Sequence, residues 1–107
     1  MSFRVEYTRH AQGEIEDSYL WIKERAPQAA EKWRDELIGK IEELADHPLR
    51  HPVAPESDKF PREIRQLLFR KRRGQFRVFY TIDGKRVVIL SVRRSARKPL
   101  EGGDLPL

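Results

Sequence analysis

Residues 74–98, GQFRVFYTIDGKRVVILSVRRSARK, decide the fold. Two hydrophobic runs meet at Asp83-Gly84, a dipeptide typical of a two-residue β-turn because both residue types tolerate positive φ. The first run alternates apolar and polar residues, as a half-buried strand does. The second run, residues 87–92, is apolar at nearly every position, which is typical of a central strand covered on both faces. We therefore expect an antiparallel hairpin.

Upstream of this hairpin, the apolar spacing predicts a strand and then two helices. Phe3, Val5 and Tyr7 alternate with polar residues and predict a short strand. Thr8 can cap a first helix, and the fixed φ of Pro27 suits the first position of a second one. The two apolar stripes are Ala11, Ile15, Tyr19, Ile22 and Ala26, and then Ala30, Trp33, Leu37, Ile41 and Leu44. So short a connection predicts an antiparallel helical hairpin.

A proline-rich stretch separates the helices from the remaining strands. Residues 47–62, HPLRHPVAPESDKFPR, contain four prolines and predict an extended loop. Residues 63–69 predict a further strand, and a basic turn follows at residues 70–74. We expect an α+β fold with an N-terminal strand, an antiparallel helical hairpin and a three-stranded antiparallel meander. Residues 1–98 would form a single domain and residues 99–107 a flexible tail.

Positive charge is concentrated in the second half of the chain. The formal net charge is +5, and from residue 62 to residue 98 only Glu63 and Asp83 oppose the lysines and arginines. Such a field attracts nucleic acid or an acidic protein, although solubility alone is the alternative explanation.

Several kinds of site are excluded or not expected. There is no cysteine, which excludes disulfides and thiolate metal sites. His47 and His51 are four residues apart but lack a third ligand, so we expect no metal and no cofactor. No apolar run has membrane-spanning length and no signal peptide is visible, so we expect a cytoplasmic protein without a membrane partner.

The expected turn sets the register of the arginines. If Asp83 and Gly84 form the turn, alternation places Arg77 and Arg94 on the face opposite the helices, and Arg65 joins them by parity. Phe79 would be their flat neighbour. We expect these guanidinium groups to converge on an open sheet face, where a phosphate or carboxylate could insert between them. The alternative is that they are edge charges that prevent aggregation.

The chain resembles the RelE/ParE superfamily of bacterial toxins, the toxic halves of type II toxin–antitoxin modules. The resembling segments are AAEKWRDELIGKIEELADHP at residues 29–48, REIRQLLF at 62–69, GQFRVFYTIDG at 74–84 and VVILSVRRSAR at 87–97. The resemblance implies an antiparallel sheet against a helical hairpin and a cognate antitoxin as partner. RelE-like members cleave mRNA in the ribosome, whereas ParE-like members poison DNA gyrase.

The resemblance also implies roles for particular residues. Arg77, in QFRVFY, matches the arginine that contacts the scissile phosphate in RelE-like members, and Arg65 falls near a basic residue of the preceding strand. The ending SVRRSAR is more similar to the ParE type, with Arg94 in place of a frequent His and no later aromatic residue. The catalytic set of a RelE-like enzyme would be Arg77, Arg65 and Arg94. The candidates for contact with a target or phosphate are Arg70, Arg73, Phe79, Arg93 and Arg97.

We therefore expect a growth-inhibiting toxin, with a ParE-like gyrase poison favoured over a RelE-like ribosome-dependent mRNA endoribonuclease. Only the RelE-like alternative would be an enzyme, because arginine stabilises charge well but accepts protons poorly. A non-toxic, basic nucleic-acid-binding module is the alternative of another class. The partner would be an acidic or partly disordered antitoxin, and the target DNA gyrase or the ribosome with its mRNA. We also expect Arg77→Ala to abolish growth inhibition while leaving the fold intact.

Overall fold

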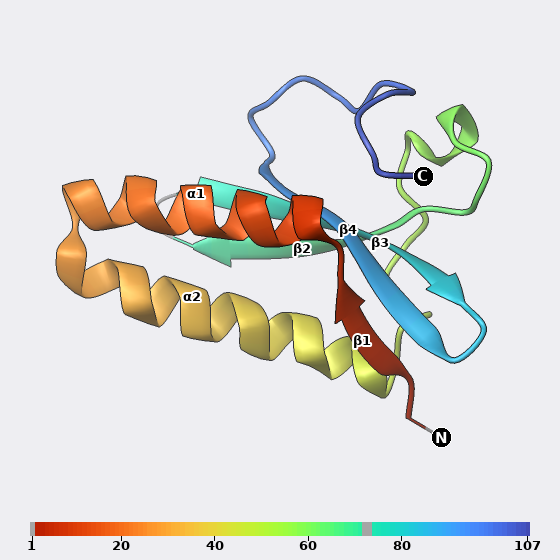
Figure 1. Ribbon diagram of the computed structural model, residues 1–107, viewed down its shortest axis with the longest axis horizontal. Coiled ribbons are helices and arrows are strands. Elements are labelled where there is room, and N and C mark those ends of the chain that lie inside the picture. Colours follow the sequence, from red (N-terminus) through yellow and green to blue (C-terminus); the bar gives the residue numbers. More distant parts are fainter. Residues whose placement is uncertain (1, 72–73) are drawn as a thin grey trace.

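A four-stranded sheet carries an antiparallel pair of helices on one face (Figure 1). The structure is a computed structural model, and it describes residues 2–71 and 74–107. The elements are β1 (Arg4–Tyr7), α1 (Arg9–Arg25), α2 (Pro27–Glu42), β2 (Arg65–Lys71), β3 (Gly74–Asp83) and β4 (Arg86–Arg94). The strand order is β1-β4-β3-β2, with β1 parallel to β4 and the other pairs antiparallel. The α+β class and the meander are confirmed, and β1 extends the meander as a parallel edge strand.

Both helices begin where the sequence predicts, but α2 ends at Glu42, and Leu44 of its predicted stripe lies in a 3₁₀ turn, Glu43–Ala45. The Thr8 hydroxyl accepts a hydrogen bond from the Ala11 amide at 3.1 Å and so caps α1. Ala26 has an extended φ of −153° between the helices, and Pro27 opens α2. The predicted stripes of both helices are buried against the sheet, except that Ala26 is only partly covered. Neither helix in the described part of the chain has the length and apolar content needed to span a bilayer.

Both faces of the sheet carry a hydrophobic core. The core on the helix side includes Trp33, whose ring lies 5.2 Å from that of Phe76. A second cluster covers the opposite face and consists of Ala54, Phe60, Ile64, Phe79, Leu90, Leu100 and Leu105. Its members come from the proline-rich loop, the strands and the C-terminal segment. The prediction of an open sheet face is therefore wrong, because the loop and the segment after Pro99 together cover that face.

The C-terminal segment lies beside the proline-rich loop (dark blue and green in Figure 1). Leu100 is fully buried and Leu105 nearly so. The Lys59 ammonium group donates a hydrogen bond to the Leu100 carbonyl at 2.8 Å. The segment that we expect to be a flexible tail is thus packed as part of the second core.

The register of β3 and β4 differs from the predicted one at two places. Asp83 pairs with Arg86, so the two-residue turn is Gly84-Lys85, with Gly84 at a positive φ of 61°. Tyr80 pairs with Ile89, but its neighbour Phe79 pairs with Ser91, which leaves Leu90 as the extra residue of a β-bulge. A bulge adds one residue to one strand, so every side chain beyond it changes face.

Candidate functional site

The bulge separates the arginines that the sequence predicts to meet. Arg77 pairs with Arg93 on the face away from the helices, whereas Arg94 pairs with Phe76 on the helix side. Arg65 pairs with Tyr80, a member of the helix-side core, near the other end of β3. The prediction that Arg77, Arg94 and Arg65 converge on one face is therefore wrong. The extra residue Leu90 moves Arg94 to the helix side of the sheet. The pairing of Arg65 with Tyr80 places Arg65 opposite a residue of the helix-side core.

Arg77 is held in a nearly closed environment. Its guanidinium group donates to both carboxylate oxygens of Glu56, at 2.7 and 2.6 Å, and to the Gln66 side-chain oxygen at 2.9 and 2.6 Å. The side chains of Arg77 and Glu56 are only 16% and 6% exposed. The same guanidinium lies 4.5 Å from the ring centroid of Phe79, as predicted for a flat neighbour, but that ring is fully buried. Arg77 therefore presents little free positive charge.

The partner Glu56 is a poor proton acceptor in this setting. Its carboxylate accepts from Arg77 and from the Leu100 amide at 3.1 Å. These hydrogen bonds, the one from Arg77 foremost, lower the pKa of Glu56 to about 2 from its usual 4.5. A general base works best with a pKa near the operating pH, so Glu56 beside Arg77 does not supply one.

The other predicted contact residues are dispersed. Arg65 donates to the His51 carbonyl at 2.7 Å and to Glu63 at 3.1 Å. Arg70 is exposed on the edge strand β2. The side chain of Arg93 is 9% exposed and lies 3.6 Å from the carboxylate of Asp104. Arg73 lies outside the described residues.

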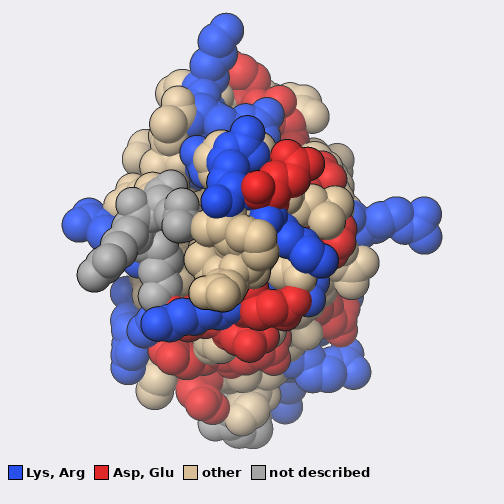
Figure 2. All heavy atoms as spheres, turned by 90° about the vertical axis from the view of Figure 1, so that its left-hand side faces the viewer, with Lys and Arg blue, Asp and Glu red and all other residues tan. Residues whose placement is uncertain are grey.

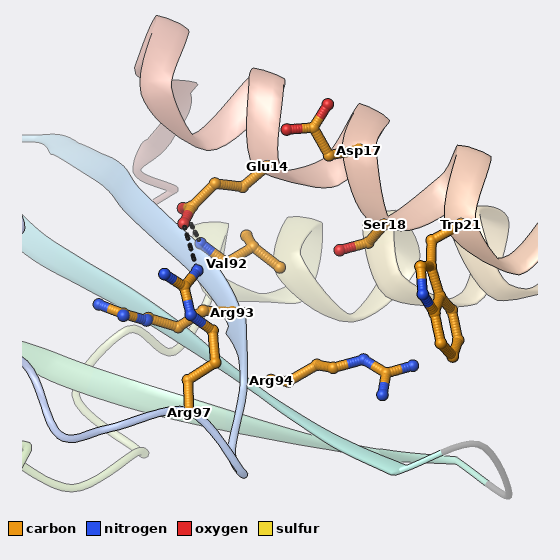
Figure 3. A pocket seen from close by; sticks show the side chains of 8 residues that line it. All are labelled: Glu14, Asp17, Ser18, Trp21, Val92, Arg93, Arg94 and Arg97. Atoms are coloured by element: carbon orange, nitrogen blue, oxygen red, sulfur yellow. Dashed lines mark hydrogen bonds and ion pairs between the residues drawn. The ribbon is translucent and has the colours of Figure 1, made fainter.

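One group of the predicted residues does share a hollow. Arg93, Arg94 and Arg97 line a space of about 280 Å³ between α1 and the end of β4, together with Glu14, Asp17, Ser18, Trp21 and Val92 (Figure 3). Arg93 and Arg94 leave β4 in opposite directions, and Arg94 extends toward Trp21 (Figure 3). The guanidinium carbon of Arg94 lies 3.9 Å from the Trp21 ring centroid and 5.7 Å from that of Phe76. These stacking contacts fix the plane of the guanidinium group.

Glu14 organises the wall of this hollow. One of its carboxylate oxygens accepts from the Ser91 hydroxyl at 2.6 Å and from the Val92 amide at 2.9 Å. The other oxygen lies 3.8 Å from Arg97. The pairing of β1 with β4 ends at Tyr7, opposite Ile89. The Glu14 side chain accepts a hydrogen bond from the Val92 amide, which lies beyond the end of that pairing.

Basic and acidic groups alternate on the face at the helix-hairpin end. Figure 2 shows Lys and Arg side chains at several separate places on this face, with Asp and Glu side chains between them. The predicted concentration of positive charge is thus divided by carboxylates from the first half of the chain. The ion pair of Arg97 with Glu14 at 3.8 Å is one example.

The residues that the sequence reasoning missed are the partners of the arginines. Glu56 lies in the proline-rich loop and Asp104 in the C-terminal segment, and no spacing relates either one to a strand residue. The sequence does single out Trp21, because this large apolar residue lies outside the apolar stripe of α1. In the structure its side chain is 40% exposed. The same holds for Leu20, which is 46% exposed.

Comparisons with known proteins agree with this architecture. A family model described as the ParE toxin of the type II toxin–antitoxin system parDE matches residues 5–99. A structure titled "Chromosomal ParDE TA system from P. aeruginosa" has a TM-score of 0.70 at 20% identity, covering 87% of this chain and 96% of that one. A mutant of the E. coli toxin RelE in the free state has a TM-score of 0.59 at 18% identity, covering 90% and 86%. A search of curated protein sequences gives no significant match.

At these identities the two solved structures establish a likeness of fold alone. The family model spans most of the chain, and with it the helical hairpin, the meander and the arginine-rich ending. The chain therefore belongs to the ParE toxin family of type II toxin–antitoxin systems.

Proposed function

We propose that this toxin inhibits growth by binding and poisoning DNA gyrase and does not cleave RNA itself. The observation that carries the proposal is the bidentate pairing of Arg77 with Glu56 under the C-terminal segment. This pairing occupies the arginine that would contact a scissile phosphate. The similarity of the ending SVRRSAR to ParE-type sequences supports the same target.

The separation of the arginines also supports a protein target. Cleavage by attack of a 2′-hydroxyl group requires a proton acceptor and a cluster of donors around the pentavalent phosphate. Arg77 and Arg94 lie on opposite faces of the sheet, and Arg65 is bonded to the loop backbone. No one phosphate could contact all three in this arrangement.

We propose that an acidic, partly disordered segment of the antitoxin inhibits this toxin. Family membership implies a cognate antitoxin. The net charge of +5 and the exposed Leu20 and Trp21 favour a partner that carries both acidic and apolar residues. Such a segment can order on binding and cover an extended surface.

The two targets can be distinguished by inducing the toxin in bacterial cells and following DNA damage and translation separately. We expect induction of the SOS response with amino-acid incorporation and transcripts intact at early times. In vitro, the purified toxin should inhibit supercoiling of relaxed plasmid by gyrase. Co-expression of the antitoxin is the matched control and should abolish both effects. A prompt stop in protein synthesis with cut transcripts and normal supercoiling would establish the RelE-like activity instead.

A further inference from the structure

Arg94 has an unsatisfied hydrogen-bonding group in the hollow between α1 and β4. Its Nη2 atom is buried and has no hydrogen-bond partner among the described residues. An unpaired buried donor on a charged group is costly, and a ligand relieves that cost once the side chains that cover this atom move aside. Because Trp21 and Phe76 hold the guanidinium plane, its donors are oriented before any ligand binds.

The ion pairs around the hollow leave Arg94 as the arginine that can receive a carboxylate. Three arginines and two carboxylates line it, and a third carboxylate, that of Asp104, pairs with Arg93 from outside the lining, so the formal charges of the group balance. Arg97 lies beside Glu14 and Arg93 beside Asp104, whereas Arg94 forms no ion pair within residues 2–71 and 74–107. One carboxylate would supply the partner that Arg94 lacks. A nucleic-acid strand would bring several phosphates toward Glu14 and Asp17 and would be repelled there.

The surroundings of the hollow indicate that the carboxylate comes from a protein. Trp21 is 40% exposed, and Leu20, three residues after Asp17 and so on the same side of α1, is 46% exposed. Arg25 stacks on the Trp21 ring as well, at 3.9 Å, but it lies 3.6 Å from Glu24 and is thus already paired. An acidic side chain flanked by apolar residues matches this combination of a fixed cation and exposed apolar groups.

We propose that the hollow lined by Trp21 and Arg94 binds an Asp or Glu side chain of the antitoxin. The carboxylate would accept hydrogen bonds from Arg94, and neighbouring apolar side chains of the antitoxin would cover Trp21 and Leu20. The proposal rests on membership of the toxin family and not on the gyrase target, so the two can fail independently.

The test measures the affinity of purified toxin variants for the protein encoded by the open reading frame beside the toxin gene. Arg94→Met keeps an unbranched stem against Trp21 and removes the charge. We expect it to weaken binding by about tenfold or more, because removal of one partner of a buried charged pair leaves the antitoxin carboxylate unpaired. Arg94→Lys should restore part of the affinity because it keeps the charge but not the planar fork.

Arg50→Met is the matched control, because Arg50 is an exposed arginine outside the hollow. It should change the affinity by less than about twofold. The unfolding midpoint of every variant is measured alongside, so that a loss of binding in a folded variant reports on the contact itself.

A double-mutant cycle identifies the partner group. Each Asp and Glu of the antitoxin is changed to Asn or Gln, and one of these changes should weaken binding to the wild-type toxin but not to Arg94→Met. Affinity for a 20-nucleotide single-stranded RNA is measured with the same variants. Wild-type affinity of Arg94→Met for the antitoxin, the absence of any coupled acid, or a loss confined to RNA binding would each overturn the proposal.

Discussion

The Glu56 carboxylate accepts hydrogen bonds from both terminal nitrogens of Arg77, at 2.7 and 2.6 Å, and a third from the Leu100 amide at 3.1 Å. One acidic side chain of the proline-rich loop thereby joins a central strand to the C-terminal segment. Both charged side chains are largely buried. Removal of either one would leave an uncompensated charge inside the protein, which is strongly destabilising.

Replacement of Glu56 should therefore cost stability. We expect Glu56→Gln to lower the free energy of unfolding by about 3 kcal/mol, measured by urea denaturation at neutral pH. Glu63→Gln is the control, because Glu63 pairs with Arg65 at 3.1 Å but its side chain is 59% exposed. That change should be within about 0.5 kcal/mol of wild type. Equal effects of the two substitutions would contradict a structural role for Glu56.

The same carboxylate predicts a pH dependence. Its hydrogen bonds to Arg77 lower the pKa of Glu56 to about 2 in the folded protein, below the usual 4.5 of an unfolded chain. The unfolded state therefore binds the proton first, and the stabilisation is complete above pH 4.5 and is lost as pH falls toward 2. The difference in unfolding free energy between wild type and Glu56→Gln should shrink over this window. If the difference in unfolding free energy stays constant from pH 6 to pH 2.5, the prediction is wrong.

Arg77 can be tested for a role beyond this pairing by changing both partners. Arg77→Ala alone would leave Glu56 buried without its partner, so the expectation that its fold stays intact is replaced by a loss of about 3 kcal/mol or more. The double change Glu56→Met with Arg77→Met should be more stable than either single change. We expect this double variant to retain growth inhibition, and this expectation replaces the loss of toxicity that the sequence predicts for Arg77→Ala. A folded double variant without toxicity would show that Arg77 contacts the target.

Thr8 connects α1 to the sheet. Its hydroxyl accepts from the Ala11 amide at 3.1 Å and donates to the Ile89 carbonyl at 3.0 Å. Thr8→Ala should lower the free energy of unfolding by about 1–2 kcal/mol, because it removes an N-cap and a second hydrogen bond. Thr8→Ser keeps the hydroxyl and should recover most of the loss. Equal loss in both variants would assign the effect to the missing methyl group.

The elements of the fold could be predicted from the sequence because each one depends on local signals. The apolar stripes, the Thr8 cap and Pro27 set the helices, and alternation sets the strands. The register depends on the exact number of residues in each strand. Residues 87–92 are apolar on both faces, so no change of alternation marks the extra residue Leu90. The predicted site was wrong for the same reason, because one inserted residue moves Arg94 to the other face of the sheet.

The partners of the arginines could not be predicted for a different reason. Glu56 and Asp104 lie in segments without periodic structure, and their positions depend on how those segments pack on the sheet. Only the apolar residues nearby give a hint. Leu100 and Leu105 are two of the three leucines in the last eight residues, and both are buried in the second core.

The C-terminal segment provides the sharpest test of that second core. Leu100 is fully buried against the cluster around Phe79, whereas Leu107 is 50% exposed. We expect Leu100→Ala to lower the free energy of unfolding by about 3 kcal/mol, because it removes buried methyl groups and leaves a cavity. The same truncation at Leu107 should change it by less than about 0.5 kcal/mol. If Leu100→Ala is as stable as wild type in urea denaturation, residues 99–107 do not pack on the sheet, and Arg77 and Glu56 would then be accessible to a target.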